Sequence, residues 1–200
     1  MTQREMSSKG GKAGTGKAKA RTSNQARTAV NARWGKIPAD LESYVASEKF
    51  DGIRAFWTGS EFMSRNGNIF PAPAWFKAGM PDIRLDGELY IGRGSFGKLL
   101  SQIQAHGSEW DGVKFMVFDL AVLRVETLDR IEQLAKLQLP DHCEIVQHVE
   151  VTREQLDALE TDIVAGGGEG VCLRHKTENY RPCNFVKVKR LFPDIDRWQG

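Results

Sequence analysis

The chain has few cysteines and no long apolar run. Its 200 residues include three cysteines, an odd number without Cys-x-x-Cys spacing, which argues against a disulfide framework and against a zinc site. No apolar stretch approaches the roughly 18 residues that span a membrane, and the N-terminus lacks the apolar core of a signal peptide. We therefore expect a cytoplasmic protein, host-cytoplasmic if viral, in a reducing compartment and without membrane contact.

Acidic and large apolar residues are scarce in the N-terminal tail. Residues 1–36 hold nine basic residues and one acidic residue, Glu5, whereas the whole chain has a net charge of +2. Residues 1–33 cannot bury apolar surface, so this tail should be disordered in isolation. A basic arm on a mildly acidic body favours DNA as its partner, although a solubilising tail is an alternative. The tail residues expected to contact DNA are Lys9, Lys12, Lys17, Lys19 and Arg21.

Residues 48–54 place charged side chains within an apolar, β-prone stretch. The segment reads Glu-Lys-Phe-Asp-Gly-Ile-Arg and contains Lys49, Gly52 and Arg54. A lysine becomes a nucleophile where burial or nearby positive charge lowers its pKa from about 10.4. Arg54 provides positive charge or binds phosphate, and Gly52 permits close approach of a ligand. The alternative interpretation is a solvated turn between two strands.

Hydrophobic periodicity predicts an alternation of strands and helices after residue 44. Turns at Gly59-Ser60 and Asn66-Gly67 predict antiparallel hairpins. Thr152 and Gln155 form a capping box that starts the last helix. Strands are expected at residues 44–50, 53–58, 61–65, 83–91, 114–120, 145–151 and 185–189. Helices are expected at residues 73–78, with Trp75 and Phe76 turned inward, at 96–105, at 127–137 and from 152 to the Gly166-Gly167-Gly168 run.

Two of the expected strands carry like charges on one face. Along residues 83–91, Asp86 and Glu88 lie on the same face because strand side chains alternate. They form either an exposed edge or a metal or ribose site. Lys187 and Lys189 also share a face, where they repel one another unless an anion lies nearby.

These stretches together resemble the ordered motifs of covalent nucleotidyltransferases, the superfamily of DNA ligases, RNA ligases and mRNA capping enzymes. Lys49-x-Asp-Gly-x-Arg54 is similar to the motif whose lysine carries the nucleotide. Gly92-Arg93-Gly94-Ser95-Phe96 resembles the small bacterial and bacteriophage ATP-dependent DNA ligases in particular. The other matching motifs are Ser64-Arg65-Asn66-Gly67, Asp86-Gly87-Glu88, Phe118-Asp119, Glu169-Gly170 through Arg174, and Lys187-x-Lys189.

The resemblance implies a role for each matching residue. Lys49 is the nucleophile that receives AMP, Phe118 stacks on the purine and Val171 closes on its other face. Glu88 and Glu169 hold Mg²⁺ or Mn²⁺, and Arg65 faces the DNA or the nucleotide. The residues expected to bind the nucleotide are Glu48, Arg54, Arg65, Glu88, Phe118, Val171, Lys187 and Lys189.

The implied fold is α+β, a nucleotidyltransferase (ATP-grasp-like) domain over residues 34–200 with two antiparallel-rich sheets and flanking helices. The nucleotide is expected in the groove between the sheets. The implied reaction seals nicked double-stranded DNA through lysyl-AMP and 5′-adenylylated DNA, in repair, replication or recombination. ATP is favoured over NAD because nothing before Lys49 resembles the nicotinamide-mononucleotide-binding domain of NAD-dependent ligases.

The sequence departs from the resemblance in one respect. It ends eleven residues after Lys189, where ligases of this kind continue into an OB-fold domain. We therefore expect a monomer without that domain, helped by an OB-fold partner supplied separately or impaired in activity. The alternatives are an RNA ligase or capping-type transferase, separated by comparing nicked RNA with nicked DNA, and a non-catalytic nucleic-acid-binding remnant, separated by testing for covalent AMP.

Overall fold

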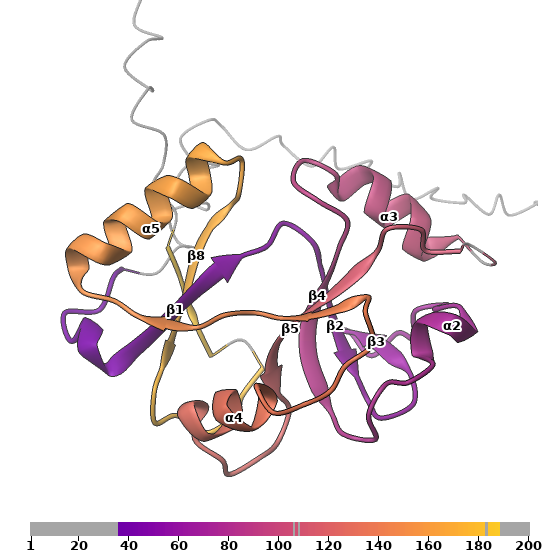
Figure 1. Cartoon of the computed structure of the whole chain (residues 1–200), viewed down its shortest axis with the longest axis horizontal. Coiled ribbons are helices and arrows are strands. Elements are labelled where there is room, and N and C mark those ends of the chain that lie inside the picture. Colours follow the sequence, from indigo (N-terminus) through magenta and orange to yellow (C-terminus); the bar gives the residue numbers. More distant parts are fainter. Residues whose placement is uncertain (1–35, 106, 108, 183, 189–200) are drawn as a thin grey trace, which may run out of the picture. The chain divides into compact units, whose positions relative to one another are not determined.

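Two β-sheets form the body of the chain in the computed structural model (Figure 1). The structure describes residues 36–105, 107, 109–182 and 184–188. They belong to the second of the two units into which the chain divides, residues 33–200. The basic tail, with Lys9, Lys12, Lys17, Lys19 and Arg21, and the predicted phosphate ligand Lys189 lie outside the described residues.

The smaller sheet has four antiparallel strands in the order β7-β1-β8-β9. Helix α5 (Arg153–Ala165) packs on it, because Leu156 and Ile163 join Ala46 and Leu173 in an apolar cluster. The predicted capping box is confirmed: the Thr152 side chain accepts from the Gln155 backbone while the Gln155 side chain accepts from the Thr152 backbone. The strands are β1 (Tyr44–Lys49), after a 3-10 turn η1 (Leu41–Ser43), β7 (Val149–Glu150), β8 (Gly170–His175) and β9 (Val186–Val188).

The larger sheet has five strands in the order β3-β2-β4-β5-β6, antiparallel except for the parallel pair β5 and β6. The predicted hairpin between β2 and β3 is confirmed. The strands are β2 (Ile53–Trp57), β3 (Phe62–Ser64), β4 (Leu85–Tyr90), β5 (Lys114–Leu120) and β6 (Cys143–Ile145).

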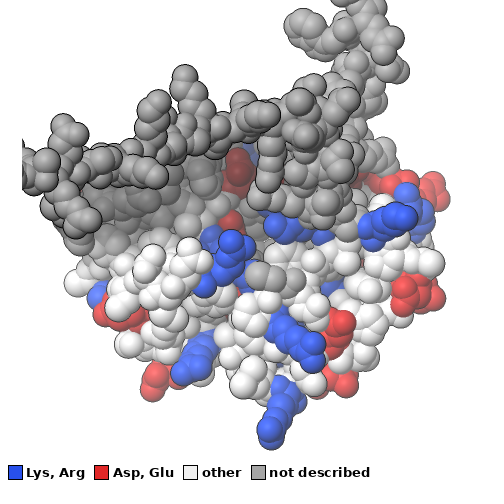
Figure 2. All heavy atoms as spheres, turned by 180° about the vertical axis from the view of Figure 1, so that it is seen from behind, with Lys and Arg blue, Asp and Glu red and all other residues white. Residues whose placement is uncertain are grey.

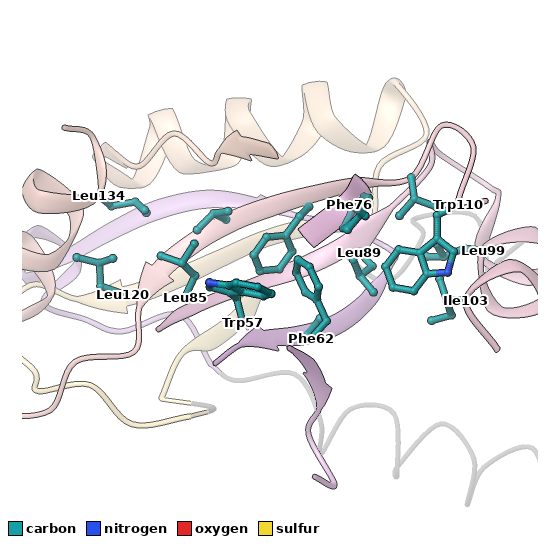
Figure 3. Close-up of a cluster of buried hydrophobic side chains, with 14 residues drawn as sticks. Trp57, Phe62, Phe76, Leu85, Leu89, Leu99, Ile103, Trp110, Leu120 and Leu134 are labelled. Atoms are coloured by element: carbon teal, nitrogen blue, oxygen red, sulfur yellow. The ribbon is translucent and has the colours of Figure 1, made fainter. Parts of the chain in front are cut away.

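One face of the larger sheet is covered by the main apolar core (Figure 3). Phe62 lies among aromatic rings, with its centroid 5.3 Å from that of Phe76 and 5.0 Å from that of Phe115. The helices that contribute buried residues to this core are α2 (Ala74–Lys77), α3 (Phe96–Gln104) and α4 (Thr127–Leu134). Since side chains alternate along β4, Leu85 and Leu89 enter the core and Asp86 and Glu88 lie on the opposite face.

Three sequence predictions about these elements are wrong. The strand expected at 145–151 is two strands, because β6 pairs with β5 in one sheet and β7 pairs with β1 in the other. Trp75 is 43% exposed rather than turned inward, since a four-residue helix directs only one of two adjacent side chains, here Phe76, into the core. Helix α4 ends at Leu134 rather than Leu137.

No helix among the described residues combines the length and apolar character needed to cross a bilayer.

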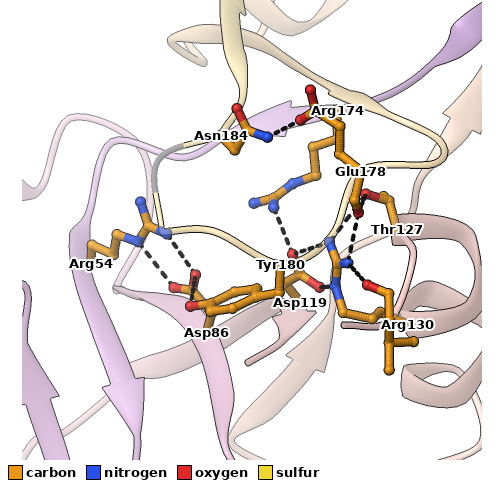
Figure 4. Close-up of polar contacts among 10 residues, drawn as sticks. Arg54, Asp86, Asp119, Thr127, Arg130, Arg174, Glu178, Tyr180 and Asn184 are labelled. Atoms are coloured by element: carbon orange, nitrogen blue, oxygen red, sulfur yellow. Dashed lines mark hydrogen bonds and ion pairs between the residues drawn. The ribbon is translucent and has the colours of Figure 1, made fainter. Parts of the chain in front are cut away.

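A buried group of charges joins the two sheets (Figure 4). Asp119 on β5 is 1% exposed and accepts hydrogen bonds from Arg130 Nε on α4 (2.7 Å) and Arg174 Nη1 on β8 (2.8 Å). Arg174 belongs to the four-stranded sheet and Asp119 to the five-stranded sheet. The ion pair therefore fixes one sheet against the other.

A second carboxylate, Asp86, extends this group. It is fully buried and accepts from Arg54 at both oxygens, at 3.0 Å from Nε and 2.6 Å from Nη2. Tyr180 donates to the same carboxylate at 3.0 Å from the segment that leaves β8. The possibility that Asp86 and Glu88 form an exposed edge is thereby excluded, because β4 is flanked by β2 and β5.

Asp119→Asn should lower the free energy of unfolding by about 3–5 kcal/mol, because it leaves Arg130 and Arg174 buried without a countercharge. Urea unfolding at pH 7 measures the difference. Glu132→Gln is the matched control, since Glu132 on α4 forms only an exposed ion pair with Lys136, which should contribute little to stability. Equal, small changes in the two variants would contradict the structural role of Asp119.

Candidate active site

Lys49 is the last residue of β1 and contacts a carboxylate 120 positions away in the sequence. Its register partner is Gly170, the first residue of β8. Glu169 directly precedes that strand, and Lys49 Nζ donates to Glu169 Oε2. The side chains are 16% and 20% exposed. The antiparallel pairing of β1 with β8 therefore brings the predicted nucleophile and a predicted metal ligand into contact.

The five-stranded sheet adds Glu88 and Arg54, which are register partners on β4 and β2. Burial raises the pKa of Glu88 to about 7. The positive charges of Lys49 and Arg54 favour the carboxylate and so oppose this rise. The negative charges of Asp86 and Glu169 add to the rise. Four of the predicted residues, Lys49, Arg54, Glu88 and Glu169, thus form one group assembled from both sheets.

Two phenylalanine rings and two further cations, Arg174 and Lys187, lie beside this group. The Phe118 ring centre is 4.7 Å from the Arg174 guanidinium carbon and 5.5 Å from that of Arg54. Phe185 is 5.3 Å and 5.4 Å from the same two carbons, and its ring is 5.6 Å from Lys187 Nζ. The structure therefore brings together Phe118 and Lys187, both predicted, with Phe185, which the sequence analysis missed.

The carboxylate of Glu48 lies apart from this group. Side chains alternate along β1, so Glu48 shares a face with Ala46, which packs in the cluster under α5. Its Oε1 accepts from Arg93 Nη2 at 2.9 Å. The expected role of Glu48 in binding the nucleotide stays a prediction.

Arg65 also lies apart from the Lys49 group. It occupies the exposed turn that follows β3. The described contacts do not bring its side chain to the group, and its expected role toward DNA or the nucleotide stays a prediction.

The prediction for Val171 is wrong. Its side chain is fully buried in the apolar cluster between the four-stranded sheet and α5. A step of one residue along a strand reverses the face, so the next residue, Cys172, lies on the face of its register partners Ser47 and Lys187. Burial raises the pKa of Cys172 to about 11. The positive charges of Arg174, Lys49 and Lys187 oppose this rise. Cys172, like Arg174 two positions further on, is therefore a side chain that this strand presents to the site.

Comparison with known proteins identifies the fold. No protein-family model matches the chain. The DNA ligase of Haemophilus influenzae is 29% identical over 158 residues, 74% of this chain and 59% of that protein. The solved structure of a Lig E DNA ligase is 35% identical, has a TM-score of 0.70, and matches over 75% of this chain and 63% of its own. The chain has the nucleotidyltransferase fold of the DNA ligases.

A more distant ligase shares this fold. The structure of the Chlorella virus DNA ligase-adenylate has a TM-score of 0.62 at 20% identity and matches over 76% of this chain and 64% of its own. The chain thus spans about three fifths of the length of the relatives that it matches. The predictions of an α+β ligase-type fold with two antiparallel-rich sheets are confirmed.

The carboxylates of Glu88 and Glu169 suit a metal ion whose remaining ligands come from water and from the phosphates of a nucleotide. In the part of the chain that the structure describes, no group of three or more His, Cys, Asp or Glu side chains is placed to hold a metal. Glu88 and Glu169 are two carboxylates close to one another. Mg²⁺ usually takes one or two protein carboxylates and completes its octahedron with water and substrate phosphates, and this pair suits such a site.

A hollow of about 390 Å³ is lined by residues of β1, β4 and β5, Glu48 among them. Met116, which lines it, is the register partner of Glu88 across β4 and β5. Phe50, Tyr90, Arg93 and Lys114 also line it. Its volume lies within the range of small-molecule sites.

Glu88→Gln should flatten the pH dependence of stability in the ligand-free protein. The pKa of Glu88 is 4.5 normally and about 7 in the folded chain, so between these values the folded state holds the extra proton. Stability should therefore fall as the pH rises from 5 to 8, by about 1–3 kcal/mol once partial exposure is allowed for. The glutamine variant cannot ionise and lacks this loss.

Urea unfolding in the presence of EDTA at pH 5, 6, 7 and 8 tests this prediction. Glu154→Gln, an exposed position on α5, is the matched control and should keep the slope of the unmodified protein. Parallel curves for Glu88→Gln and the unmodified protein would show that Glu88 ionises normally.

Proposed function

We propose that this chain is the nucleotidyltransferase domain of an ATP-dependent DNA ligase, which seals nicked double-stranded DNA through lysyl-AMP and 5′-adenylylated DNA. The observation that carries the proposal is the contact of Lys49 with Glu169 beside Glu88 and Arg54. A relative of the same fold was solved as the ligase-adenylate, which supports ATP as the source of the AMP. We assign residues 34–200 to this domain and expect it to act as a monomer in the cytoplasm.

The first step is attack by Lys49 Nζ on the α-phosphorus of ATP. A nitrogen–phosphorus bond forms as the bond to the pyrophosphate oxygen breaks. Only the uncharged amine attacks, so Lys49 must leave its ion pair with Glu169 and lose a proton before the bond forms. The nucleotide brings negative charge into the site and so changes the electrostatic surroundings of both Lys49 and Glu169.

Positive charge around the phosphate lowers the barrier of this step. Arg54 and Lys187 are two cations on the site face, and each can pair with phosphate oxygens. Mg²⁺ or Mn²⁺ bound at Glu88 and Glu169 would add further positive charge at the phosphates. Phe118 offers a ring on which a purine can stack, an interaction of about 1–3 kcal/mol. Cys172, rather than Val171, is the side chain from this part of β8 that faces the site.

Lys49→Ala should abolish sealing of nicked DNA by the protein with ATP. Lys49→Arg should be equally inactive, because a guanidinium stays protonated and cannot attack phosphorus. Gel analysis of a nicked duplex measures sealing, with nicked RNA run alongside. Sealing that survives in Lys49→Ala would contradict the proposed nucleophile, and preferential sealing of RNA would contradict DNA as the substrate.

DNA binding is expected to draw on the basic tail. Basic and acidic side chains are interspersed on the face of the body seen in Figure 2. The tail, in contrast, has nine basic residues against Glu5 within residues 1–36. We propose that Lys9, Lys12, Lys17, Lys19 and Arg21 of the tail, together with Arg65 of the body, contact DNA phosphates.

Deleting residues 1–33 should weaken DNA binding at low salt and flatten the dependence of affinity on salt. Each lost phosphate contact reduces the slope of log K against log salt by about 0.9 for duplex DNA. Fluorescence anisotropy with a nicked duplex over a range of NaCl concentrations gives this slope. An unchanged slope after the deletion would show that the tail makes no phosphate contacts.

A further inference from the structure

Arg93 links the five-stranded sheet to the segments on which Lys49 and Glu169 lie. It occupies the turn after β4, between Gly92 (φ 121°) and Gly94 (φ 68°). Its Nη2 donates to Glu48 Oε1 at 2.9 Å. Its Nη1 donates to the backbone carbonyl of Gly166 and, at 3.4 Å, to that of Ile163. One guanidinium thus contacts the end of β1 and the end of α5.

The carbonyls that Arg93 contacts belong to a helix C-terminus. The last carbonyls of a helix lack intrahelical partners and carry the negative end of its dipole. Helix α5 has no basic residue in its own last turn. Arg93, 70 positions before Ile163, therefore provides the positive charge that the sequence of α5 lacks.

The glycines after α5 leave room for this contact. A Cβ on Gly166 would lie only 2.2 Å from Arg93 Nη1 and overlap it, whereas a Cβ on Gly168 would first meet the side chain of Ile163. Gly166 has an ordinary backbone (φ −77°), so its conformation does not require glycine. Space for the guanidinium is the reason that a side chain is disfavoured at Gly166.

We infer that Arg93 is a positioning residue for the covalent step: it holds the 166–168 loop, and with it Glu169, against the end of β1 that carries Lys49. Glu48 directly precedes Lys49, and Gly166 lies three residues before Glu169, so Arg93 contacts the chain a short distance before each member of the Lys49–Glu169 pair. Arg93 acts through these segments and makes no described contact with Lys49 or Glu169. The kinetic part of this inference rests on the proposed function, whereas the structural part does not.

Hydrogen exchange tests the structural part without any activity. In the ligand-free protein, Arg93→Ala should speed exchange of the amides of residues 166–170 by about tenfold and leave β5 unchanged. Gly166→Ala should have the same effect, because the added methyl displaces the guanidinium while the arginine itself is kept. Arg153→Ala is the matched control, since Arg153 forms an exposed ion pair with Asp157 on α5. Unchanged exchange at residues 166–170 in Arg93→Ala would overturn the inference.

Single-turnover formation of the AMP adduct tests the kinetic part. Arg93→Ala should lower the maximal rate about tenfold or more, while the ATP concentration that gives half the maximal rate changes less than threefold. Arg93→Lys should recover part of the rate, because an ammonium pairs with Glu48 but cannot also span both carbonyls. The double variant Arg93→Ala/Gly166→Ala should be no slower than Arg93→Ala, since both changes remove the same contact.

The outcomes separate the two proposals. A normal adduct rate in Arg93→Ala, or independent losses that multiply in the double variant, would overturn the positioning role. If the unmodified protein forms no adduct, the proposed function fails, and the exchange experiment alone decides whether Arg93 holds the loop.

Discussion

The buried pairing of Asp119 with Arg130 and Arg174 is the constraint on which the rest of the structure depends. A charge that is 1% exposed is stable only if its partners stand at hydrogen-bond distance. Arg174 comes from one sheet and Asp119 from the other, so this requirement fixes how the sheets face each other. Apolar packing does not provide the same restraint, because each sheet has its own core cluster.

The candidate site follows from that arrangement. The four-stranded sheet carries Lys49 and Glu169, and the five-stranded sheet carries Glu88 and Arg54. Neither sheet alone has both the amine and the buried carboxyl whose pKa lies near 7. In this structure the cations and carboxylates neutralise one another, and Lys49 is held in an ion pair with Glu169.

Sequence reasoning succeeded where the pattern is local. Period-two alternation placed Asp86 and Glu88 on one face, and the Thr152–Gln155 spacing gave the helix start. The motif spacing singled out Lys49 and Glu169, which the structure brings into contact. In each case the information lies within a few neighbouring residues or in the order of known motifs.

Sequence reasoning failed where distant segments decide the outcome. The segment from residue 145 to 151 looks like one strand, but its two ends pair in different sheets. Val171 and Cys172 are both apolar in character, and only the register with β1 shows which one faces the site. Tyr180 gave no local signal, and the Gly-Arg-Gly motif around Arg93 did not show what Arg93 contacts, because their partners lie 94 and 45 positions away.

The account depends most directly on the identity of the residue that carries AMP. Incubation of the protein with ATP and Mg²⁺, followed by proteolysis and mass spectrometry of the peptides, locates that residue. The account predicts a single phosphoramide-linked AMP on Lys49, at the end of β1. AMP on any other residue, or no covalent AMP at all, would contradict it.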